Sequence, residues 1–284
     1  MPRIAYVNGQ YKTHMYASVH IEDRGFQFAD GVYEVIYVYN EKFIDLDMHF
    51  DRLDRSLKEL DIQWPVNRSA LNIIIQEVVR RNRVKNGNIY LQVTRGSNDR
   101  EFSYPEDLSP SLIVYARKAN KDSIETTEKG YKIVSKPDIR WKRCDIKTIS
   151  LLPAVMAKQA AVEEGAIEAW LVDDDGLVTE GTSSNAWIVT EKNEIITRST
   201  NNFILSGVTR KTILQLSQDL GLKYKERAFS LVEAKEAKEA FCTSSTALIK
   251  PIIQIDKKRI GSGTVGPVTK ILIKNYFNYV EQNL

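Results

Sequence analysis

Arg143-Cys144-Asp145-Ile146-Lys147 is the stretch that decides the fold assignment of this 284-residue chain. Residues 131–136 before it alternate between apolar and polar side chains as a strand does. Ser150 with Pro153 after it predicts the start of a helix, with the serine as its cap. Lys147 is therefore expected at a strand-to-helix transition. An amine held in a partly buried site there is poorly solvated as an ammonium ion, so its pKa falls and it becomes a nucleophile, which makes Lys147 our candidate catalytic residue.

A second stretch that contains candidate functional side chains is Thr179-Glu180-Gly181-Thr182-Ser183-Ser184-Asn185, which we expect to form a polar loop. It follows a strand expected at residues 168–173 and a turn at residues 174–176. Further on, residues 207–210 (GVTR) lead into a helix, whose first-turn N–H groups lack helical partners and can bind phosphate. A simple capping motif has the same sequence, so both interpretations stay open at this point.

Arg52 lies in a predicted helix that Asp47 caps and whose apolar residues recur at intervals of three and four, from Phe50 to Leu60. The arginine flanks the buried face of this helix. It is either a charge at the rim or a ligand for an anion, for which the planar guanidinium is well suited. The helix pattern alone favours neither interpretation.

Five motifs resemble, in order and in spacing, those of the fold type IV pyridoxal-phosphate aminotransferases, and most closely the D-amino acid aminotransferases. They are DRGxQFxDGVYE at residues 23–34, VTRG at 93–96, IRWxRCDIK at 139–147, TEGxSSN at 179–185 and GVTR at 207–210. Each motif is weak alone, whereas together they are specific and extend over nearly the whole chain. The resemblance implies a two-domain α/β (α+β) fold and the cofactor pyridoxal 5'-phosphate. It favours the anion-ligand interpretation of Arg52.

The resemblance also implies roles for particular residues. Lys147 is the lysine that forms a Schiff base with the cofactor and then moves a proton as general acid and base. Glu180 pairs with the protonated pyridine nitrogen and so keeps the ring an electron sink. Arg52, Val208, Thr209 and Ser245 are expected to bind the cofactor phosphate. Ser183 and Ser184 are expected to be further cofactor-binding residues. The substrate-binding residues are Tyr33, Arg100 and Phe102.

The substrate loop departs from the family pattern at one position. In the D-amino acid aminotransferases an Arg-x-His pair after VTRG binds the substrate carboxylate together with the tyrosine of DGVYE. This chain has Arg-Glu-Phe at residues 100–102. The arginine is kept and the histidine is lost, so we expect Arg100 to be the principal carboxylate ligand, with Tyr33 as a second donor. The alternative is that the phenylalanine only packs the loop while another basic residue, Arg24 or Arg140, binds the carboxylate.

The functional prediction is transamination between D-amino acids such as D-alanine and 2-oxo acids such as 2-oxoglutarate. Within the same fold, branched-chain aminotransferases and aminodeoxychorismate lyases are the alternatives, and the RCDIK and DGVYE motifs favour the D-amino acid group over them. A non-catalytic protein that binds pyridoxal phosphate is an alternative from another class. The resemblance further implies a homodimer whose active sites lie at the domain interface, each completed by the partner's loop at residues 96–110.

A polar and unpatterned segment at residues 119–127 predicts the domain organisation. We interpret it as a linker between an N-terminal α/β domain at residues 1–118 and a larger C-terminal α/β domain at residues 128–284 that carries Lys147. The patterns also predict several helices and strands. Helices are expected from Ser69, over about 151–164 and within 226–239, and strands at 4–8, 34–39, 89–95, 112–117, 184–190 and 195–197.

The bulk composition excludes several classes of protein. Forty Lys and Arg against 37 Asp and Glu leave a net charge of +3, which argues against nucleic acid or an acidic membrane as a partner. Cys144 and Cys242 are far apart and the three histidines lack metal-ligand spacing, so we expect neither a metal site nor a disulfide. The N-terminal residues lack the apolar region of a signal peptide, and no segment is apolar enough to span a bilayer. We therefore expect a cytoplasmic protein.

Residues 261–266 (GSGTVG) satisfy the pattern G-x-G-x-x-G of dinucleotide-binding folds. Such a fold needs another strand and an acidic residue about 20 positions further on. Too few residues follow Gly266 for this, and they have the pattern of one terminal helix. We therefore predict a turn followed by a helix that begins at Pro267.

Overall fold

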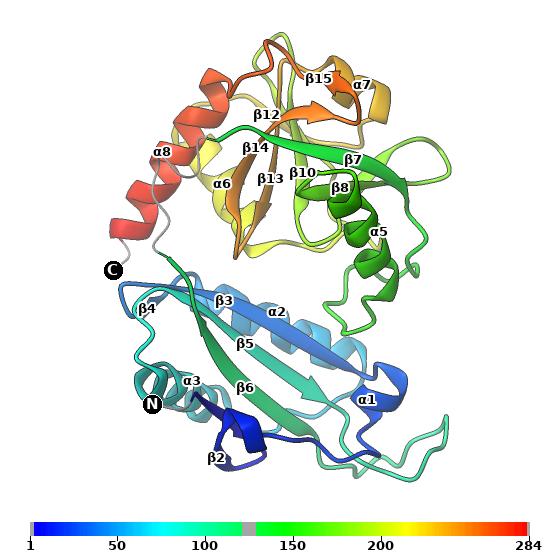
Figure 1. The fold of residues 1–284 in the computed structure, drawn as a ribbon, viewed down its shortest axis with the longest axis vertical. Helices are drawn as coiled ribbons and strands as arrows, with labels where there is room; N and C mark the ends of the chain where they lie inside the picture. The colour runs from blue at the N-terminus through cyan, green and yellow to red at the C-terminus, as the bar shows by residue number, and fades with distance from the viewer. Residues whose placement is uncertain (1–2, 121–128, 283–284) are drawn as a thin grey trace. The chain divides into compact units, whose positions relative to one another are not determined.

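The computed structural model describes residues 3–120 and 129–282. These divide into two compact units, drawn in Figure 1: residues 3–120 with 146–150, and residues 129–145 with 151–282. Most of the linker predicted at residues 119–127 lies outside the described residues. One correction concerns Lys147, which was expected in the C-terminal domain. The segment Ile146–Ser150 packs with the first unit, because Ile146 joins its apolar core.

The first unit is built on a six-stranded antiparallel sheet in the order β2-β1-β6-β5-β3-β4. Alternate residues of its long strands are buried, as expected for a sheet that packs on one face. The strands are β1 (Ile4–Val7), β2 (Gln10–Thr13), β3 (Gly31–Tyr39), β4 (Lys42–Phe43), β5 (Gly87–Thr94) and β6 (Ser111–Lys118). The predicted strands at 34–39, 89–95 and 112–117 are thereby confirmed within a few residues.

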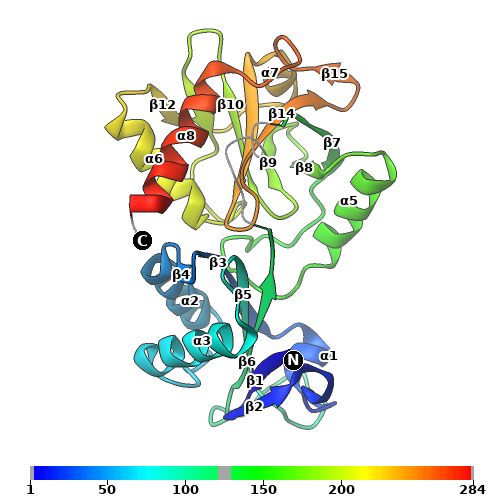
Figure 2. The same ribbon diagram turned by 60° about the vertical axis from the view of Figure 1, so that its left-hand side comes forward.

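Two long helices, α2 (Leu46–Glu59) and α3 (Arg68–Asn82), cover one face of this sheet, as Figure 2 shows. Their apolar residues and the inward side chains of the strands form one core. The short helices η1 (His14–Tyr16) and α1 (Arg24–Phe28) precede β3.

The caps of both long helices lie two residues earlier than predicted. Leu46 opens α2 after Asp45, whose side chain makes no capping hydrogen bond, so Asp47 lies in the first turn instead of at the cap. Asn67, not Ser69, caps α3, because its extended backbone lets Oδ1 accept from the Ala70 amide at 2.8 Å.

The segment that contains Lys147 adds a short pairing to the start of β3. The amide of Tyr33 donates to the Lys147 carbonyl at 3.0 Å, and the amide of Ile149 donates to the Gly31 carbonyl at 3.1 Å. Between them Thr148 forms an isolated bridge with Val32. The backbone of Lys147 is therefore fixed directly against the DGVYE motif.

The second unit contains a mixed nine-stranded sheet in the order β12-β11-β10-β13-β14-β7-β8-β9, with β15 paired to β14. The pairs β7–β8, β7–β14 and β11–β12 are parallel and the others antiparallel. The strands are β7 (Tyr131–Pro137), β8 (Glu168–Val172), β9 (Val178–Gly181), β10 (Asn185–Val189), β11 (Ile195–Thr197), β12 (Tyr224–Glu226), β13 (Glu239–Ser244), β14 (Leu248–Ile255) and β15 (Lys258–Arg259).

The helices of the second unit are α5 (Leu152–Glu163), α6 (Val208–Asp219), α7 (Leu231–Glu236) and α8 (Pro267–Gln282), and α6 packs beside α8 (Figures 1 and 2). Helix α5 carries Pro153 in its first turn as predicted, but Leu151 takes the cap position that was expected for Ser150. Helix α7 is much shorter than the predicted stretch 226–239, because Ser230 caps its start and Ala237 has an extended backbone that ends it.

The turn and helix start predicted for GSGTVG are confirmed. Helix α8 begins at Pro267, and its first amides are capped by a buried carboxylate from β13. Glu239 accepts from the amides of Val268 at 3.0 Å and Thr269 at 2.7 Å. A Cβ at Gly266 would collide with the Glu239 side chain, so glycine is needed for this close approach. The helix N-terminus that could have bound a phosphate is thus occupied by the protein's own carboxylate.

Candidate functional site

The Lys147 amine lies over the ring of Tyr33, with Nζ 4.1 Å from the ring centroid. Tyr33 belongs to a row of stacked tyrosines, with ring centroids 5.7 Å from Tyr33 to Tyr90 and 5.0 Å from Tyr90 to Tyr115. These side chains alternate with those that enter the helix-covered core, so they lie on the other face of the sheet. The Lys147 side chain is half-buried at this face. In the sequence Lys147 lies between strand β7 and helix α5, as predicted.

Arg52 is buried and bound to a carboxylate. Its Nε and Nη2 donate to the two oxygens of Glu34 at 2.8 and 2.7 Å, and Nδ1 of His49 lies 2.7 Å from Glu34 Oε2. Burial alone raises the pKa of Glu34, but Arg52 and His49 outweigh it and hold this pKa well below its ordinary value. The interpretation of Arg52 as a charge at the rim is therefore wrong. Its role as a phosphate ligand stays a prediction.

Helix α2 brings Arg52 close to the Lys147 segment. Ser56 follows Arg52 by one helical turn on the same face, and its Oγ accepts from the amide of Lys147 at 3.4 Å. Tyr33, Arg52 and Lys147, which are far apart in the sequence, are thus gathered in the first unit around the start of β3.

The loop at residues 96–110 presents Arg100 and Phe102 at the surface. The Phe102 side chain is 82% exposed, with its ring 5.5 Å from that of Phe28, and the Arg100 guanidinium lies 5.3 Å from the same Phe28 ring. Arg24, the alternative carboxylate ligand, is buried and its guanidinium donates to Asp30 and to the carbonyls of this loop. Arg24 is therefore engaged inside the protein.

In the second unit, β9 positions Glu180 in a buried network. Both carboxylate oxygens accept hydrogen bonds: Oε1 from Arg140 Nη1 at 2.6 Å, and Oε2 from Asn185 Nδ2 and the Leu205 amide at 3.1 Å each. Arg140 is in turn held by Asp138 at 2.9 and 2.8 Å. Burial raises the pKa of Glu180, and Arg140 opposes this rise without cancelling it. Arg140, the other alternative carboxylate ligand, is thus bound to Glu180.

Asn185 connects this carboxylate with the N-terminus of α6. Its Nδ2 also donates to the Leu205 carbonyl at 2.9 Å, and a Cβ at Gly207 would collide with its Oδ1. Val208 and Thr209, the first residues of α6, follow at once, and first-turn amides have no acceptor within their own helix. A buried carboxylate and a helix N-terminus thus lie beside each other. These groups suit a cofactor that carries a basic ring nitrogen and a phosphate.

The expected loop at residues 179–185 is a strand and a turn. Val178–Gly181 forms β9, because the turn at residues 173–176 brings the chain back antiparallel to β8, and β10 begins at Asn185. The hydroxyls of Thr182, Ser183 and Ser184 donate to the buried carboxylate of Glu168, the latter two at 3.1 Å each.

Ser245 follows the end of β13, whose Thr243 pairs with Asn185 at the start of β10. The predicted cofactor-binding residues of the second unit, Glu180, Ser183, Ser184, Val208, Thr209 and Ser245, thus gather at one end of its sheet.

Sequence reasoning missed three residues of this cluster: Glu168, Arg140 as a partner of Glu180, and Asn185. Arg140 and Asn185 stand inside the motifs IRWxRCDIK and TEGxSSN, which was the available signal. Glu168 begins a strand of otherwise apolar residues, where a charge needs partners. That isolated charge could have indicated a buried network.

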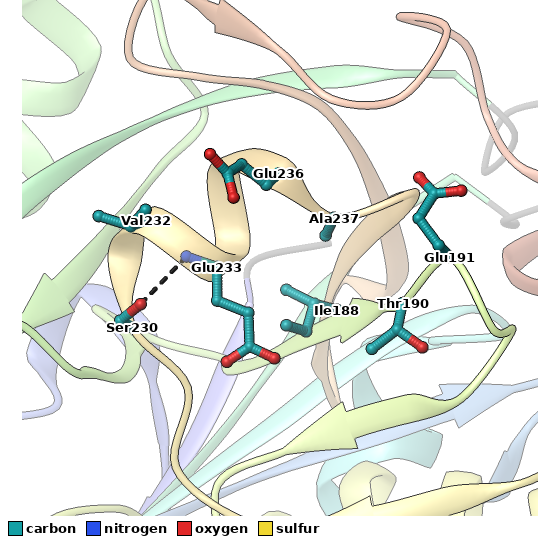
Figure 3. A pocket seen from close by; sticks show the side chains of 8 residues that line it. All are labelled: Ile188, Thr190, Glu191, Ser230, Val232, Glu233, Glu236 and Ala237. Atoms are coloured by element: carbon teal, nitrogen blue, oxygen red, sulfur yellow. Dashed lines mark hydrogen bonds between the residues drawn. The ribbon is translucent and has the colours of Figure 1, made fainter.

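A separate cavity of about 380 Å³ lies beside α7 and β10. Figure 3 shows three glutamates around it, Glu191, Glu233 and Glu236, with Ser230 Oγ accepting from the Glu233 amide at 3.0 Å. Glu233 is paired with Arg227 at 2.6 Å, and the predicted site residues do not line this cavity. Within residues 3–120 and 129–282, no group of three or more metal-ligating side chains is arranged around a common point, and no described helix is long and apolar enough to cross a membrane.

The sequence of the chain is similar to one known family throughout. The family model described as amino-transferase class IV matches residues 31–255. The D-alanine aminotransferase of Bacillus licheniformis is 43% identical over 93% of this chain and 92% of that protein, and the enzyme of the same name from Staphylococcus haemolyticus is 36% identical over 97% of each.

Solved structures agree on the fold. The branched-chain aminotransferase of the archaeon Thermoproteus uzoniensis, solved with norvaline, matches 98% of this chain and 94% of its own, with a TM-score of 0.85 and 26% identity. The branched-chain amino acid aminotransferase of Escherichia coli also matches 98% of this chain and 94% of its own, with a TM-score of 0.89 and 22% identity.

Proposed function

The chain belongs to the class IV aminotransferase family, and on this premise we propose that it transfers amino groups between D-amino acids such as D-alanine and 2-oxo acids such as 2-oxoglutarate, with pyridoxal 5'-phosphate as cofactor. The observation that carries the proposal is the buried Glu180, linked through Asn185 to the N-terminus of α6. A carboxylate for a pyridinium and backbone donors for a phosphate are the two groups that this cofactor requires. The names of the relatives support D-alanine as the substrate.

The cofactor supplies an electron sink for the electrons of the substrate Cα–H bond. Glu180 would stabilise the positive charge at the ring nitrogen, while Arg140 holds this carboxylate by a hydrogen bond to Oε1. The phosphate would be held by the amides of Val208 and Thr209, by Arg52 and by Ser245, and Ser183 and Ser184 are further residues proposed to contact the cofactor. Each of these assignments is supported by the chemistry of the donor: amide, guanidinium or hydroxyl.

Lys147 acts as general base and acid at the substrate Cα. Its Nζ would take the proton from this carbon and, as the resulting ammonium, would donate a proton again later in the reaction. The Tyr33 ring, 4.1 Å from Nζ, restricts the directions open to the amine. Tyr33 and Arg100 bind the substrate carboxylate, and Phe102 lines the substrate with apolar surface.

The protein acts as a homodimer in which the loop at residues 96–110 completes the site of the partner. Several large apolar side chains of the first unit are exposed, and such side chains are available for a protein–protein interface. They include Met15 at 80%, Ile21 at 75%, Phe26 at 74% and Phe102 at 82%. Sedimentation at assay concentration checks this, and an active monomer contradicts it.

The protein binds amino acids and 2-oxo acids as its partners besides the second subunit, acts in the cytoplasm, and has no role that involves nucleic acid or a membrane. Both cysteines carry free thiols, and burial raises the pKa of Cys144 to about 11 and of Cys242 to about 12. The absence of a disulfide between these two thiols fits a reducing compartment.

A half-reaction followed by the absorbance of the bound cofactor tests the function. The protein is mixed with D-alanine alone, and an enzyme converts the cofactor and releases pyruvate, whereas a non-catalytic binding protein leaves the spectrum unchanged. L-Leucine and D-glutamate in parallel separate the D-amino acid group from the branched-chain aminotransferases. Conversion with L-leucine but not with D-alanine contradicts the proposed substrate class.

A further inference from the structure

The loop that carries Arg100 is held by one buried arginine, Arg24 of α1, whose side chain is only 4% exposed. Nη1 of Arg24 donates to the carbonyls of Glu101 at 2.6 Å and Ser103 at 3.3 Å. Nη2 donates to the carbonyl of Phe102 at 3.3 Å. One guanidinium therefore binds three consecutive carbonyl groups that directly follow Arg100.

Asp30 and Tyr104 fix the guanidinium of Arg24 from two other sides. Asp30 Oδ2 accepts from Nε of Arg24 and from Nε of Arg95, both at 2.8 Å. The Tyr104 ring lies 3.6 Å from Cζ of Arg95 and 5.4 Å from Cζ of Arg24. Arg24 and Asp30 of the motif at 23–34 and Arg95 of the motif at 93–96 thus hold this loop together.

The geometry of these contacts requires arginine. A planar guanidinium offers five donors at fixed angles, whereas the ammonium of lysine is one compact charge with three donors. The three carbonyls and the carboxylate are bound by three different nitrogens of Arg24, so a lysine at position 24 reaches only part of them. A buried guanidinium in turn needs these acceptors, because an unpaired buried charge is strongly destabilising. The conformation of the loop and the position of Arg24 therefore depend on each other.

The ring of Phe28 lies close to the guanidinium groups of both Arg24 and Arg100. The Phe28 ring centroid lies 4.8 Å from Cζ of Arg24 and 5.3 Å from Cζ of Arg100. The two guanidinium groups thus contact the same ring. We propose that Arg24 is a positioning residue that fixes the backbone after Arg100 and thereby sets the direction in which Arg100 meets the substrate carboxylate. This inference rests on the proposed function of Arg100.

The kinetic test compares Arg24→Met and Arg24→Lys with the unaltered holoenzyme. Arg100 stays present but loses its fixed direction, so KM for D-alanine is expected to rise about 10-fold while kcat changes less than about 3-fold, the signature of lost uniform binding. An amine without a carboxylate is expected to react equally with all three proteins. Adding Arg24→Met to Arg100→Ala should raise KM no further, because both act through the same contact. A fall in kcat without a rise in KM, or additive effects in the double variant, overturns the proposal.

Trypsin cleavage after Arg100 tests the same role without catalysis. A protease binds its substrate in extended form, so the held loop must open first. Both variants should be cleaved at this bond about 10-fold faster than the unaltered protein, while Arg68→Met, an exposed arginine paired with Asp51 at 2.7 Å, serves as control and should not change the rate. Unchanged cleavage in Arg24→Met, or restoration of the unaltered rate by Arg24→Lys, overturns the positioning role. If the unaltered protein does not transaminate D-alanine, the proposed function fails, and cleavage still decides the role of Arg24.

Discussion

The guanidinium of Arg140 donates to Oε1 of Glu180 at 2.6 Å, although 40 positions separate the two residues in the sequence. Asp138 holds the other side of Arg140, so the arginine is fixed between two carboxylates. Burial raises the pKa of Glu180, and the positive charge of Arg140 limits that rise. Arg140 therefore favours the ionised form of Glu180.

Glu180→Gln is expected to leave the fold and much of the cofactor affinity intact but to lower turnover at least about 100-fold, since each factor of ten corresponds to about 1.4 kcal/mol of barrier. The neutral amide no longer stabilises a pyridinium, so proton removal from the substrate becomes harder. Turnover and a cofactor titration, measured on the same preparation, separate the two effects. Glu233→Gln, which changes a glutamate paired with Arg227, is the matched control. Normal turnover in the Glu180 variant rules out this role.

Lys147→Ala is expected to fold normally, to bind cofactor weakly, and to lack both transamination and the absorbance of a protonated lysine Schiff base. The reason is that the proton transfer at the substrate needs an amine in reach, and alanine has none. The unfolding temperature, the absorption spectrum and the half-reaction with D-alanine check each part. Lys142→Ala, an exposed lysine of the same motif, should behave as the unaltered protein. Near-normal transamination by the Lys147 variant contradicts the assignment.

The sequence motifs located most groups of the candidate site but not their partners. The helix start at Val208 and the position of Lys147 between β7 and α5 followed from local patterns of capping and alternation. The pairing of Arg52 with Glu34 did not, because it depends on packing α2 against β3. Local patterns describe neighbours along the chain, whereas the partners of buried charges are chosen by tertiary packing.

The same limit explains the errors. Thr179–Gly181 is polar in sequence and was expected in a loop, yet it forms β9, since pairing with β8 decides its conformation. The five residues at 146–150 were assigned to the C-terminal domain by their position along the chain, whereas Lys147 and Ile149 make backbone hydrogen bonds to β3 of the first unit.

Acid should destabilise the first unit through Glu34. The pKa of Glu34 is lower in the folded protein than in the unfolded chain, where it is near 4.5. The ionised carboxylate therefore stabilises the folded state fully above about pH 4.5, and this stabilisation is lost progressively as the pH falls below 4.5. Glu34→Gln should lower the free energy of unfolding at pH 7 by about 3–5 kcal/mol, because Arg52 is left buried without its anion. The difference from the unaltered protein should shrink towards pH 3, as measured by urea unfolding.

Glu77→Gln is the control for the acid experiment. Hydrogen bonds from Arg80 and Arg81 lower the pKa of Glu77 to about 2, but this carboxylate lies on the protein surface. Solvent screens such a pair, so its loss should matter far less at pH 7 than the loss of Glu34. Equal effects of the two substitutions contradict the importance of burial.

The resemblance to the D-amino acid aminotransferases implies a histidine where this chain has Phe102, and this difference makes the final prediction specific to this chain. Arg100 can still hold a carboxylate with two hydrogen bonds, and Tyr33 can add a third, so carboxylate binding should survive with fewer donors. Phe102 is 82% exposed and adds apolar surface, so we expect D-alanine to bind more weakly than in relatives with the histidine and bulkier or less acidic amino donors to be tolerated better. Phe102→His should raise kcat/KM for D-alanine, because it adds a donor.

Arg100→Ala provides the opposite change at the same loop. It should lower kcat/KM for D-alanine by about 10- to 100-fold, as expected for the loss of a charged hydrogen-bonding partner worth about 1.5–3 kcal/mol. An amine that lacks the carboxylate cannot make this contact. Neither substitution should therefore change the rate at which the enzyme converts this amine. Because Arg24 and Arg140 are engaged by Asp30 and Glu180, neither is placed to replace the lost guanidinium. Equal effects on both amino donors would show that Arg100 acts on the loop instead of on the carboxylate.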